Sequence, residues 1–307
     1  MKRIVAIGAA VLSVVASGAA AQPRPDDGYR HEIAAPAYTS GAGPVVCFDD
    51  GHNSYHRASG LYRPFVTLIE ADGFRSVAVS DPLGRASLRG CALLVIVNPV
   101  AAGNVEDWAH PHHPAYGTAE VRAILEWTRD GGGLMLIVDH APIPGAVAGL
   151  AELLGVHMFD GEARNDPSSP LPDVFQRADA TLVAHPITDG RTASERVDRV
   201  ATWTGHAFLA SRRFDPLMRF GDRSRAWADI SETVAGFAPA DNPVFEVRGW
   251  LQAAARPLRD GRVVVLGEAG MCTALLRAGT PRGMNSDRAG DTAQFCLNAV
   301  RWLARVL

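Results

Sequence analysis

Short apolar runs recur along this chain and are separated by segments with a helical spacing of apolar residues. Continuous apolar runs bounded by turn residues predict strands that are covered on both faces of a sheet. The runs lie at residues 45–48, 76–79, 93–98, 134–138 and 262–266. Apolar residues at the i, i+3 and i+4 spacing predict helices between or after them. These helices are expected at residues 61–72, 119–129, 145–155 and 292–306.

This alternation of strand and helix predicts right-handed βαβ units and therefore a mostly parallel sheet. Residues 44–307 are interpreted as one α/β domain. Residues 160–249 break the rhythm, because they are rich in Pro, Asp and Arg and hold only short strand-like pieces near 197–203. We interpret this stretch as an irregular insertion, made of loops and an antiparallel extension at the edge of the sheet.

The first residues have the pattern of a secretory signal peptide. Lys2 and Arg3 precede an apolar stretch at 4–16, and the small-residue run Ala19–Ala20–Ala21 follows. The apolar stretch is shorter than the roughly 18 residues that a membrane-spanning helix needs, although a retained anchor is the alternative. The sequence thus predicts a signal peptide at 1–21, a flexible lead-in at 22–43, and a periplasmic or secreted protein with no membrane span after cleavage.

Composition and charge narrow the class of partner. The 307 residues are 47% hydrophobic and 21% charged, which is typical of a globular chain of enzyme size. A net charge of −3 and a pI near 6.4 argue against nucleic acid as a partner. The cysteines are Cys47, Cys91, Cys272 and Cys296. We expect inert core cysteines, with a Cys272–Cys296 bridge or a catalytic cysteine as alternatives.

Polar residues cluster where three of the predicted strands end. Asp49, His52, Asn53 and His56 follow the first strand, Asp139 and His140 follow the strand at 134–138, and Glu268 follows the strand at 262–266. Parallel strands present their carboxyl ends to one crevice, where ligands bind. The sequence therefore predicts a site at this edge, with Asp49, His52, Asp139, His140 and Glu268 as catalytic candidates.

The chemistry of these residues leaves several roles open. His52, His56 and Asp139 could hold one divalent metal such as zinc, whereas the plainer alternative is a loop wall in which Asp49 orients His52. The pair Asp139–His140 could act as general acid and base, or Asp139 could accept backbone amides at a helix start. Asn53 and Asn285 are predicted to contact substrate.

Other motifs exclude chemistry rather than suggest it. The turn after the strand at 134–138 contains neither Ser nor Cys, which disfavours a serine or cysteine hydrolase. No G-x-G-x-x-G motif follows a strand and no P-loop motif is present, which disfavours dinucleotide and P-loop nucleotide binding. His110, His112 and His113 could ligate a metal, but Pro111 and Pro114 favour a plain exposed loop.

An ordered series of motifs is spread over residues 44–307: FDDGHNSYH, GGGLMLIVDHAPIPGA, HPIT, GRVVVLGEAGM and QFCLNAVRWL. As a set they resemble an exported bacterial family of unknown function, the domain of unknown function 4350. The family is related to the class I glutamine amidotransferase-like and trehalose-utilisation (ThuA-like) proteins. The resemblance implies a flavodoxin-like three-layer sandwich with a mostly parallel sheet. Its first motif resembles F-D-E-A-H-N-N-F-H, from which this chain departs at Asp50 and Gly51.

The resemblance also bears on activity. True amidotransferases carry a Cys where this chain has Asp139–His140, so glutaminase chemistry is not expected. Together the observations predict an exported hydrolase for a small polar or carbohydrate-like substrate, acting through Asp, His and Glu with or without a divalent metal. The alternative is a non-catalytic module that binds a small ligand or carbohydrate on the same scaffold.

Overall fold

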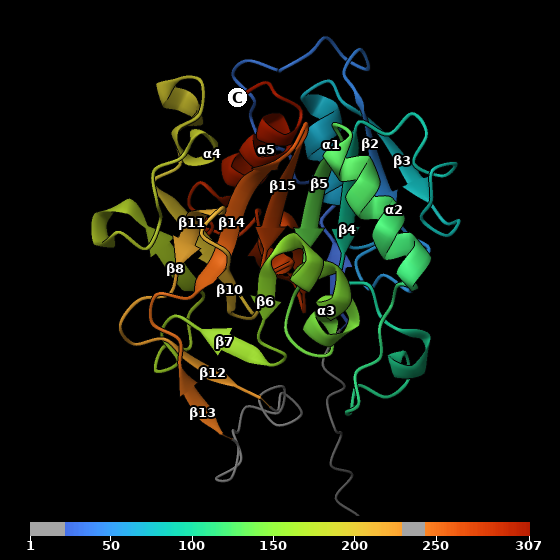
Figure 1. Ribbon diagram of the computed structural model, residues 1–307. Coiled ribbons are helices and arrows are strands. Elements are labelled where there is room, and N and C mark those ends of the chain that lie inside the picture. The colour runs from blue at the N-terminus through green and yellow to red at the C-terminus, as the bar shows by residue number, and fades with distance from the viewer. Residues whose placement is uncertain (1–21, 229–242) are drawn as a thin grey trace, which may run out of the picture.

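The computed structural model describes residues 22–228 and 243–307, so the predicted signal peptide lies outside the described residues. Its centre is a mixed α/β arrangement around one large sheet, whose strand order is β3-β2-β4-β5-β15-β14-β10-β6 with β11 also paired to β14 (Figure 1). The parallel strands are β2 (Val45–Asp49), β3 (Arg75–Val79), β4 (Leu93–Val97), β5 (Gly133–Ile137) and β15 (Gly261–Leu266). Each of the five apolar runs in the sequence is one of these strands.

The sheet continues beyond β15 with antiparallel strands. These are β14 (Leu251–Leu258), β11 (Asp215–Arg219), β10 (Phe208–Ala210) and β6 (Val156–Met158). The antiparallel extension predicted at the sheet edge is thus present, but its longest strand, β14, lies just after the stretch where we expected it. The sheet as a whole remains mostly parallel because its centre is built from the five strands above.

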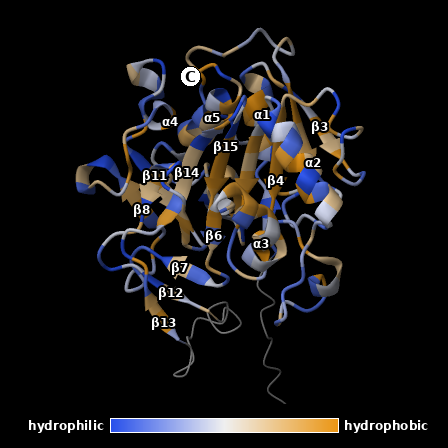
Figure 2. Ribbon diagram, in the orientation of Figure 1, coloured by the Kyte–Doolittle hydropathy of each residue, from blue (hydrophilic) through white to orange (hydrophobic). Residues whose placement is uncertain are grey.

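Helices cover both faces of the sheet. They are α1 (Arg63–Ala71), α2 (Thr118–Arg129), α3 (Ile143–Leu154), α4 (Pro186–Asp189) and α5 (Thr292–Leu303). Alternate residues of each strand point to opposite faces. Helices α1 and α5 lie on one face, and α2 and α3 lie on the other (Figures 1 and 2). Accordingly Phe48 of β2 joins the core under α1 and α5, whereas Cys47 joins the core under α2 and α3. The four long helices agree with the predicted ones to within three residues at either end.

Small strands and single turns complete the described chain. One three-stranded sheet contains β7 (Glu162–Arg164), β12 (Arg225–Trp227) and β13 (Val244–Glu246), and a separate antiparallel pair contains β8 (Asp173–Gln176) and β9 (Arg199–Thr202). Another three-stranded sheet contains β1 (Arg24–Pro25), β16 (Ala274–Arg277) and β17 (Thr280–Gly283). The 3-10 turns are η1 (Ala102–Asn104), η2 (Arg177–Asp179), η3 (Ala193–Glu195) and η4 (Gly270–Cys272). Through β1, the lead-in at 22–43 pairs with a strand near the far end of the chain.

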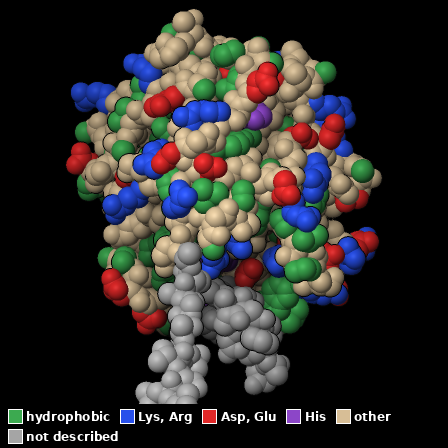
Figure 3. Space-filling model, turned by 180° about the vertical axis from the view of Figure 1, so that it is seen from behind, with side chains coloured by type: hydrophobic (Ala, Val, Ile, Leu, Met, Phe, Trp, Pro, Cys, Tyr) green, Lys and Arg blue, Asp and Glu red, His purple; other side chains and the backbone are tan. Residues whose placement is uncertain are grey.

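Acidic and basic side chains are interspersed on the surface seen from behind (Figure 3). No described helix combines the length and the apolar character that crossing a bilayer requires.

The cysteines form two disulfides, Cys47–Cys91 and Cys272–Cys296. Our expectation of inert core thiols is therefore wrong, and the bridge considered as an alternative is present. Cys47 lies in β2 and Cys91 lies two residues before the neighbouring β4, so their Cα atoms come within 5.7 Å. That distance is in the range that a disulfide spans without backbone movement.

Removing the Cys272–Cys296 bridge should destabilise the protein measurably. The bridge joins η4 to α5 across a sequence separation of 24 residues. Closing a loop of this length in the unfolded chain is worth about 3 kcal/mol. The double variant Cys272→Ala/Cys296→Ala should lose about that free energy of unfolding in urea titrations. A loss below about 1 kcal/mol would show that the bridge does not constrain the unfolded chain.

Candidate functional site

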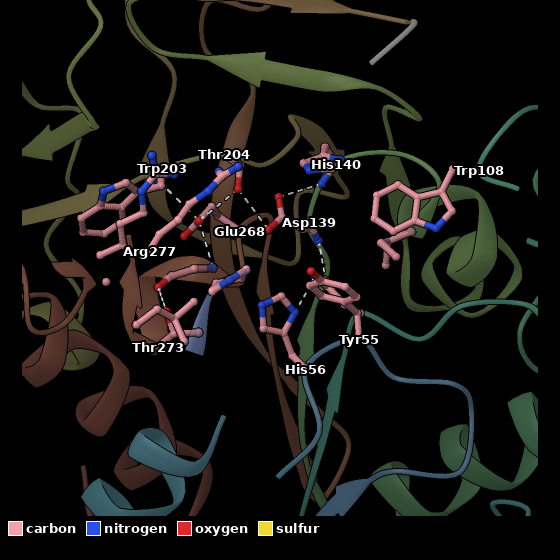
Figure 4. Close-up of a pocket in the computed structure, with 17 residues that line it drawn as sticks. Tyr55, His56, Trp108, Asp139, His140, Trp203, Thr204, Glu268, Thr273 and Arg277 are labelled. Carbon is pink, nitrogen blue, oxygen red and sulfur yellow. Dashed lines mark hydrogen bonds between the residues drawn. The ribbon is translucent and has the colours of Figure 1, made fainter. Parts of the chain in front are cut away.

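A cavity of about 180 Å³ lies at the carboxyl ends of β2, β4, β5 and β15. Each strand contributes at least one side chain to it: His56 from the loop after β2, Asn98 just after β4, Asp139 and His140 after β5, and Glu268 after β15 (Figure 4). This is the edge at which open parallel sheets bind their ligands. Four of the predicted site residues, His56, Asp139, His140 and Glu268, therefore line one cavity.

Two carboxyl groups meet on the floor of the cavity through one hydroxyl. The Oγ1 of Thr204 lies 3.1 Å from Oδ2 of Asp139 and 3.3 Å from Oε1 of Glu268. A threonine hydroxyl has a single hydrogen to donate. It can satisfy both contacts only if it donates to one carboxylate and accepts a proton from the other carboxyl group. The geometry thus favours a pair that holds one proton.

Glu268 is the carboxyl group best placed to carry that proton. It is fully buried, and burial raises its pKa well above the usual range, an effect that the charge of Asp139 reinforces. Backbone N–H groups of Met271, Trp203 and Gly270 donate to it and act in the opposite direction. The effect of burial on the pKa of Glu268 is larger than the effect of these donors, because burial removes the charged carboxylate from water. Glu268 is thereby the candidate proton donor of the pair.

Asn98 connects the histidine of the cavity to the carboxyl pair. Its Nδ2 donates to Nδ1 of His56 at 3.0 Å, and its Oδ1 accepts the backbone N–H of Asp139 at 2.8 Å. His56 consequently carries its own proton on Nε2. Burial lowers the pKa of His56 to about 4, so the ring is neutral at ordinary pH.

His140 has the opposite tautomer. Its Nδ1–H donates to the carbonyl of Ala141 at 2.8 Å, so the lone pair of the imidazole is on Nε2. The side chain is only half-buried and lines the cavity (Figure 4). An imidazole nitrogen and a buried carboxyl group that line the same cavity are groups that general acid–base catalysis uses.

Aromatic side chains form the walls. Tyr55 and Trp108 remain 46% and 38% exposed, and their ring centroids lie 6.2 Å apart. Trp203 lies on the other side of the carboxyl pair (Figure 4). Our sequence interpretation missed these aromatic residues, as well as Thr204 and Asn98. Only Asn98 had a usable signal, since it is a polar residue at the end of an apolar run, as Asp139 is.

Comparisons with known proteins place this chain by its fold alone. No family model matches it, and no curated protein is similar to it. Among solved structures, the mmIFT52 N-terminal domain superposes with a TM-score of 0.58 at 11% identity, covering 84% of this chain and 97% of that one. A ThuA-like protein from Bacteroides uniformis gives 0.45 at 12% identity, covering 89% and 94%. The cytoplasmic protein STM3548 from Salmonella typhimurium gives 0.48 at 11%, covering 85% and 98%.

Asp49 and His52 belong to a separate cluster that does not line the cavity. The ring of His52 lies between Asp49, 2.8 Å from Nδ1, and Glu120 of α2, 2.9 Å from Nε2. Burial lowers the pKa of His52, but the hydrogen bonds and charges of both carboxylates outweigh it and raise that pKa. The hydroxyl of Tyr116 also donates to Asp49. This arrangement resembles our plainer alternative, a wall in which Asp49 orients His52.

The remaining predicted residues also lie apart from the cavity lining. The Nδ2 of Asn53 donates to the carbonyl of Val100, and that of Asn285 donates to Asp26 and to the carbonyl of Leu275. The three predicted metal ligands are divided, because His52 bonds Asp49 and Glu120 whereas His56 faces Asn98. Within the described residues, the group of side chains spaced for a metal is instead His110, His112 and Asp160.

Beside the cavity residues, His206 is fully buried, and neither ring nitrogen has a hydrogen-bond partner in the described part of the chain. Burial lowers its pKa to about 4. An unfolded histidine titrates near pH 6.5, so between about pH 6.5 and 4 the unfolded state binds more protons than the folded state. The free energy of unfolding that depends on neutral His206 is therefore fully present above pH 6.5 and is lost as the pH falls from about 6.5 to 4.

Replacing His206 by Leu should remove its share of this acid sensitivity. Over the window, the wild type should lose up to about 3 kcal/mol more than His206→Leu in free energy of unfolding. Urea titrations at pH 7, 5.5 and 4 measure the difference. Equal losses in the two proteins would contradict a neutral, buried His206. His56 has the same direction of shift in both proteins, so it cancels in the comparison.

Proposed function

We propose that the cavity is the active site of an exported hydrolase that acts on a small polar or carbohydrate-like substrate. The observation that carries the proposal is the carboxyl pair Asp139–Glu268, joined by Thr204 at the end of a cavity with aromatic walls. When two neighbouring carboxyl groups have different environments, their pKa values differ, and one can then act as an acid while the other stays charged. Glu268 is buried and Asp139 lies beside it.

In the proposed mechanism Glu268 donates its proton to the leaving atom of the substrate. The Nε2 of His140 accepts a proton from the attacking water, since its Nδ1 is already committed to Ala141. Asp139 orients the hydroxyl of Thr204 between the two carboxyl groups, and its charge helps to keep the pKa of Glu268 high. No Ser or Cys nucleophile takes part. The divided positions of His52, His56 and Asp139 favour this acid–base route over the metal-assisted one.

The fold supports the wider family proposal. Counted in chain order, the five parallel strands β2, β3, β4, β5 and β15 stand in the order 2-1-3-4-5, which is the flavodoxin order. Helices lie on both faces. We therefore propose a flavodoxin-like three-layer sandwich related to the amidotransferase-like and ThuA-like groups, and to the exported family of the domain of unknown function 4350.

Two observations support export to the periplasm or beyond. The N-terminal pattern is that of a signal peptide. All four cysteines are bonded in disulfides, which persist in oxidising compartments and are rare in the cytosol.

One observation favours a binding module as the second candidate. Both oxygens of Glu268 already accept backbone N–H groups, a pattern that also suits a carboxyl group with a purely structural role. Exposed Tyr55 and Trp108 would then offer ring faces to the apolar face of a sugar.

A substrate panel with a parallel binding assay tests the proposal. The mature chain is assayed on small nitrophenyl esters, anilides and glycosides, and the same sugars are titrated by calorimetry. Turnover of at least one class supports the hydrolase. Sugar binding without any turnover supports the binding module and overturns the hydrolase. If the chain shows no turnover and binds none of the sugars, both proposals are overturned.

A further inference from the structure

A second cluster of ligand-type side chains lies just outside the cavity. His110 and His112 come from the loop between η1 and α2, and Asp160 follows β6. One ligand atom from each of the three lies within 4.8 Å of the others. The rings of His110 and His112 are stacked, with centroids 3.8 Å apart and planes inclined by 25°. The sequence suggested a plain exposed loop, but the side chain of His112 is only 4% exposed.

The hydrogen bonds of His112 leave one nitrogen facing a carboxylate. Its Nε2 lies 2.9 Å from the carbonyl oxygen of Trp108, toward which a ring nitrogen can only donate. Its Nδ1 lies 2.7 Å from Oδ2 of Asp160. In a neutral ring this Nδ1 carries a lone pair, and a lone pair does not lie stably against a carboxylate. A positive charge must lie between them, either a second proton or a metal cation.

Asp160 is held in position as a ligand by its other oxygen. The backbone N–H of Gly145, in the first turn of α3, donates to Oδ1 at 3.2 Å. A hydrogen bond to the oxygen that does not contact the metal orients a metal-binding carboxylate. The packing also requires Gly145, because a Cβ there would lie 2.6 Å from the Cβ of His112 and 2.7 Å from Oδ2 of Asp160. The side chains of His112 and Asp160 therefore pack directly against Gly145, where no larger residue fits.

We propose that His110, His112 and Asp160 bind one divalent transition metal, with Zn²⁺ as the best match. Two imidazoles and one carboxylate, completed by water, form a common four-coordinate zinc set. Ligands about 2.0–2.1 Å from a tetrahedral zinc stand about 3.3 Å apart. The contact between His112 and Asp160 has to open by about 0.6 Å to reach this separation. The exposed ring of His110 supplies the third ligand from the solvent side.

The site would act on the cavity through Trp108. The carbonyl of Trp108 accepts the hydrogen bond of His112. The centroid of the Trp108 indole ring lies 6.2 Å from that of the His140 ring. A metal that fixes the loop at 108–112 thus fixes one aromatic wall of the cavity. This role is structural and leaves the acid–base residues unchanged, so it is independent of whether the cavity is catalytic.

Zinc titration of the chelator-treated full chain tests the proposal. Calorimetry should show one Zn²⁺ per chain, and the variants His110→Ala and Asp160→Asn should each weaken its binding by at least about tenfold. His113→Ala is the matched control, because this neighbouring histidine is also exposed but is outside the cluster. It should bind as the wild type does.

Two results would overturn the site. In the first, the wild type does not bind Zn²⁺. In the second, His110→Ala binds as tightly as the wild type. His110 is exposed, so its loss should leave the fold intact, and thermal unfolding of each variant without metal verifies this. Because the readout is metal binding, the result does not depend on finding a substrate.

Discussion

Replacing Arg301 by Met is expected to lower the free energy of unfolding by about 3–5 kcal/mol. Arg301 of α5 is 1% exposed and lies between two buried carboxylates. Its Nε and Nη2 donate to both oxygens of Asp72, at 2.8 and 2.6 Å, and its Nη1 lies 2.8 Å from Oε1 of Glu195. Methionine would fill much of the space but leave the buried charge of Asp72 without its cation, whereas Glu195 would keep its ion pair with Arg191. Urea titration at neutral pH measures the loss.

Two further variants separate charge from packing. In Arg301→Met/Asp72→Asn the stranded charge of Asp72 is removed, so part of the stability should return. Arg196→Met is the surface control, since its pair with Asp198 is 51% and 60% exposed and should contribute below about 1 kcal/mol. If Arg301→Met costs no more than this control, the buried network does not hold α5 against the rest of the protein.

The network also shows why α5 was only partly predictable. Its sequence suggested one apolar face made by residues such as Phe295 and Trp302. Every residue of the helix is buried, including Gln294, Asn298 and Arg301. A helix with polar residues on its outer side normally faces solvent. Here the chain around α4 and η3 covers that side and supplies Glu195, a tertiary contact from about a hundred positions earlier that periodicity cannot reveal.

Four of the parallel strands, β2, β4, β5 and β15, were predictable because burial on both faces leaves continuous apolar runs. The edge strand β3 is mostly exposed, and only its short run of apolar residues indicated it. β14 was not predictable, since its sequence LQAAARPL is rich in Ala and contains Arg256 and Pro257, which have little strand preference. It forms a strand because it lies beside β15 and β11, whose ladders satisfy its backbone. Context outweighed propensity at this position.

The sequence predicted that the site lies at the strand ends, but not which side chains there point into the cavity. Asp49 is the last residue of β2 and Asp139 lies two residues after β5, yet Asp49 contacts Tyr116 and His52 rather than the cavity. Side chains alternate between faces along a strand, and the loop conformation after the strand decides which residue turns inward. Thr204 and Trp203 come from the loop after β9, inside the irregular stretch, so no local pattern connects them to Glu268.

If the cavity is catalytic, Glu268→Gln should lower turnover by about 10² or more, the contribution of a general acid. Glutamine keeps the size of the side chain but cannot donate a carboxyl proton. Its amide nitrogen would face one of the backbone N–H donors that Glu268 accepts, so thermal unfolding must be compared as well. The kinetic loss should appear in kcat and persist at temperatures where the variant is fully folded.

Asp139→Asn tests the same pair through its pH dependence. The charge of Asp139 helps to raise the pKa of Glu268, and the proposed acid works only while protonated. Activity should therefore be retained below that pKa and lost as the pH rises through it. Removing the charge lowers the pKa, so the alkaline limb of the kcat profile should move to lower pH. Asparagine can donate to Thr204 and accept the N–H of His140, which preserves the local hydrogen bonds. Asp107→Asn, at an exposed position near Trp108, should leave the limb in place. A limb that stays at the wild-type pH in Asp139→Asn would mean that Glu268 is not the titrating acid.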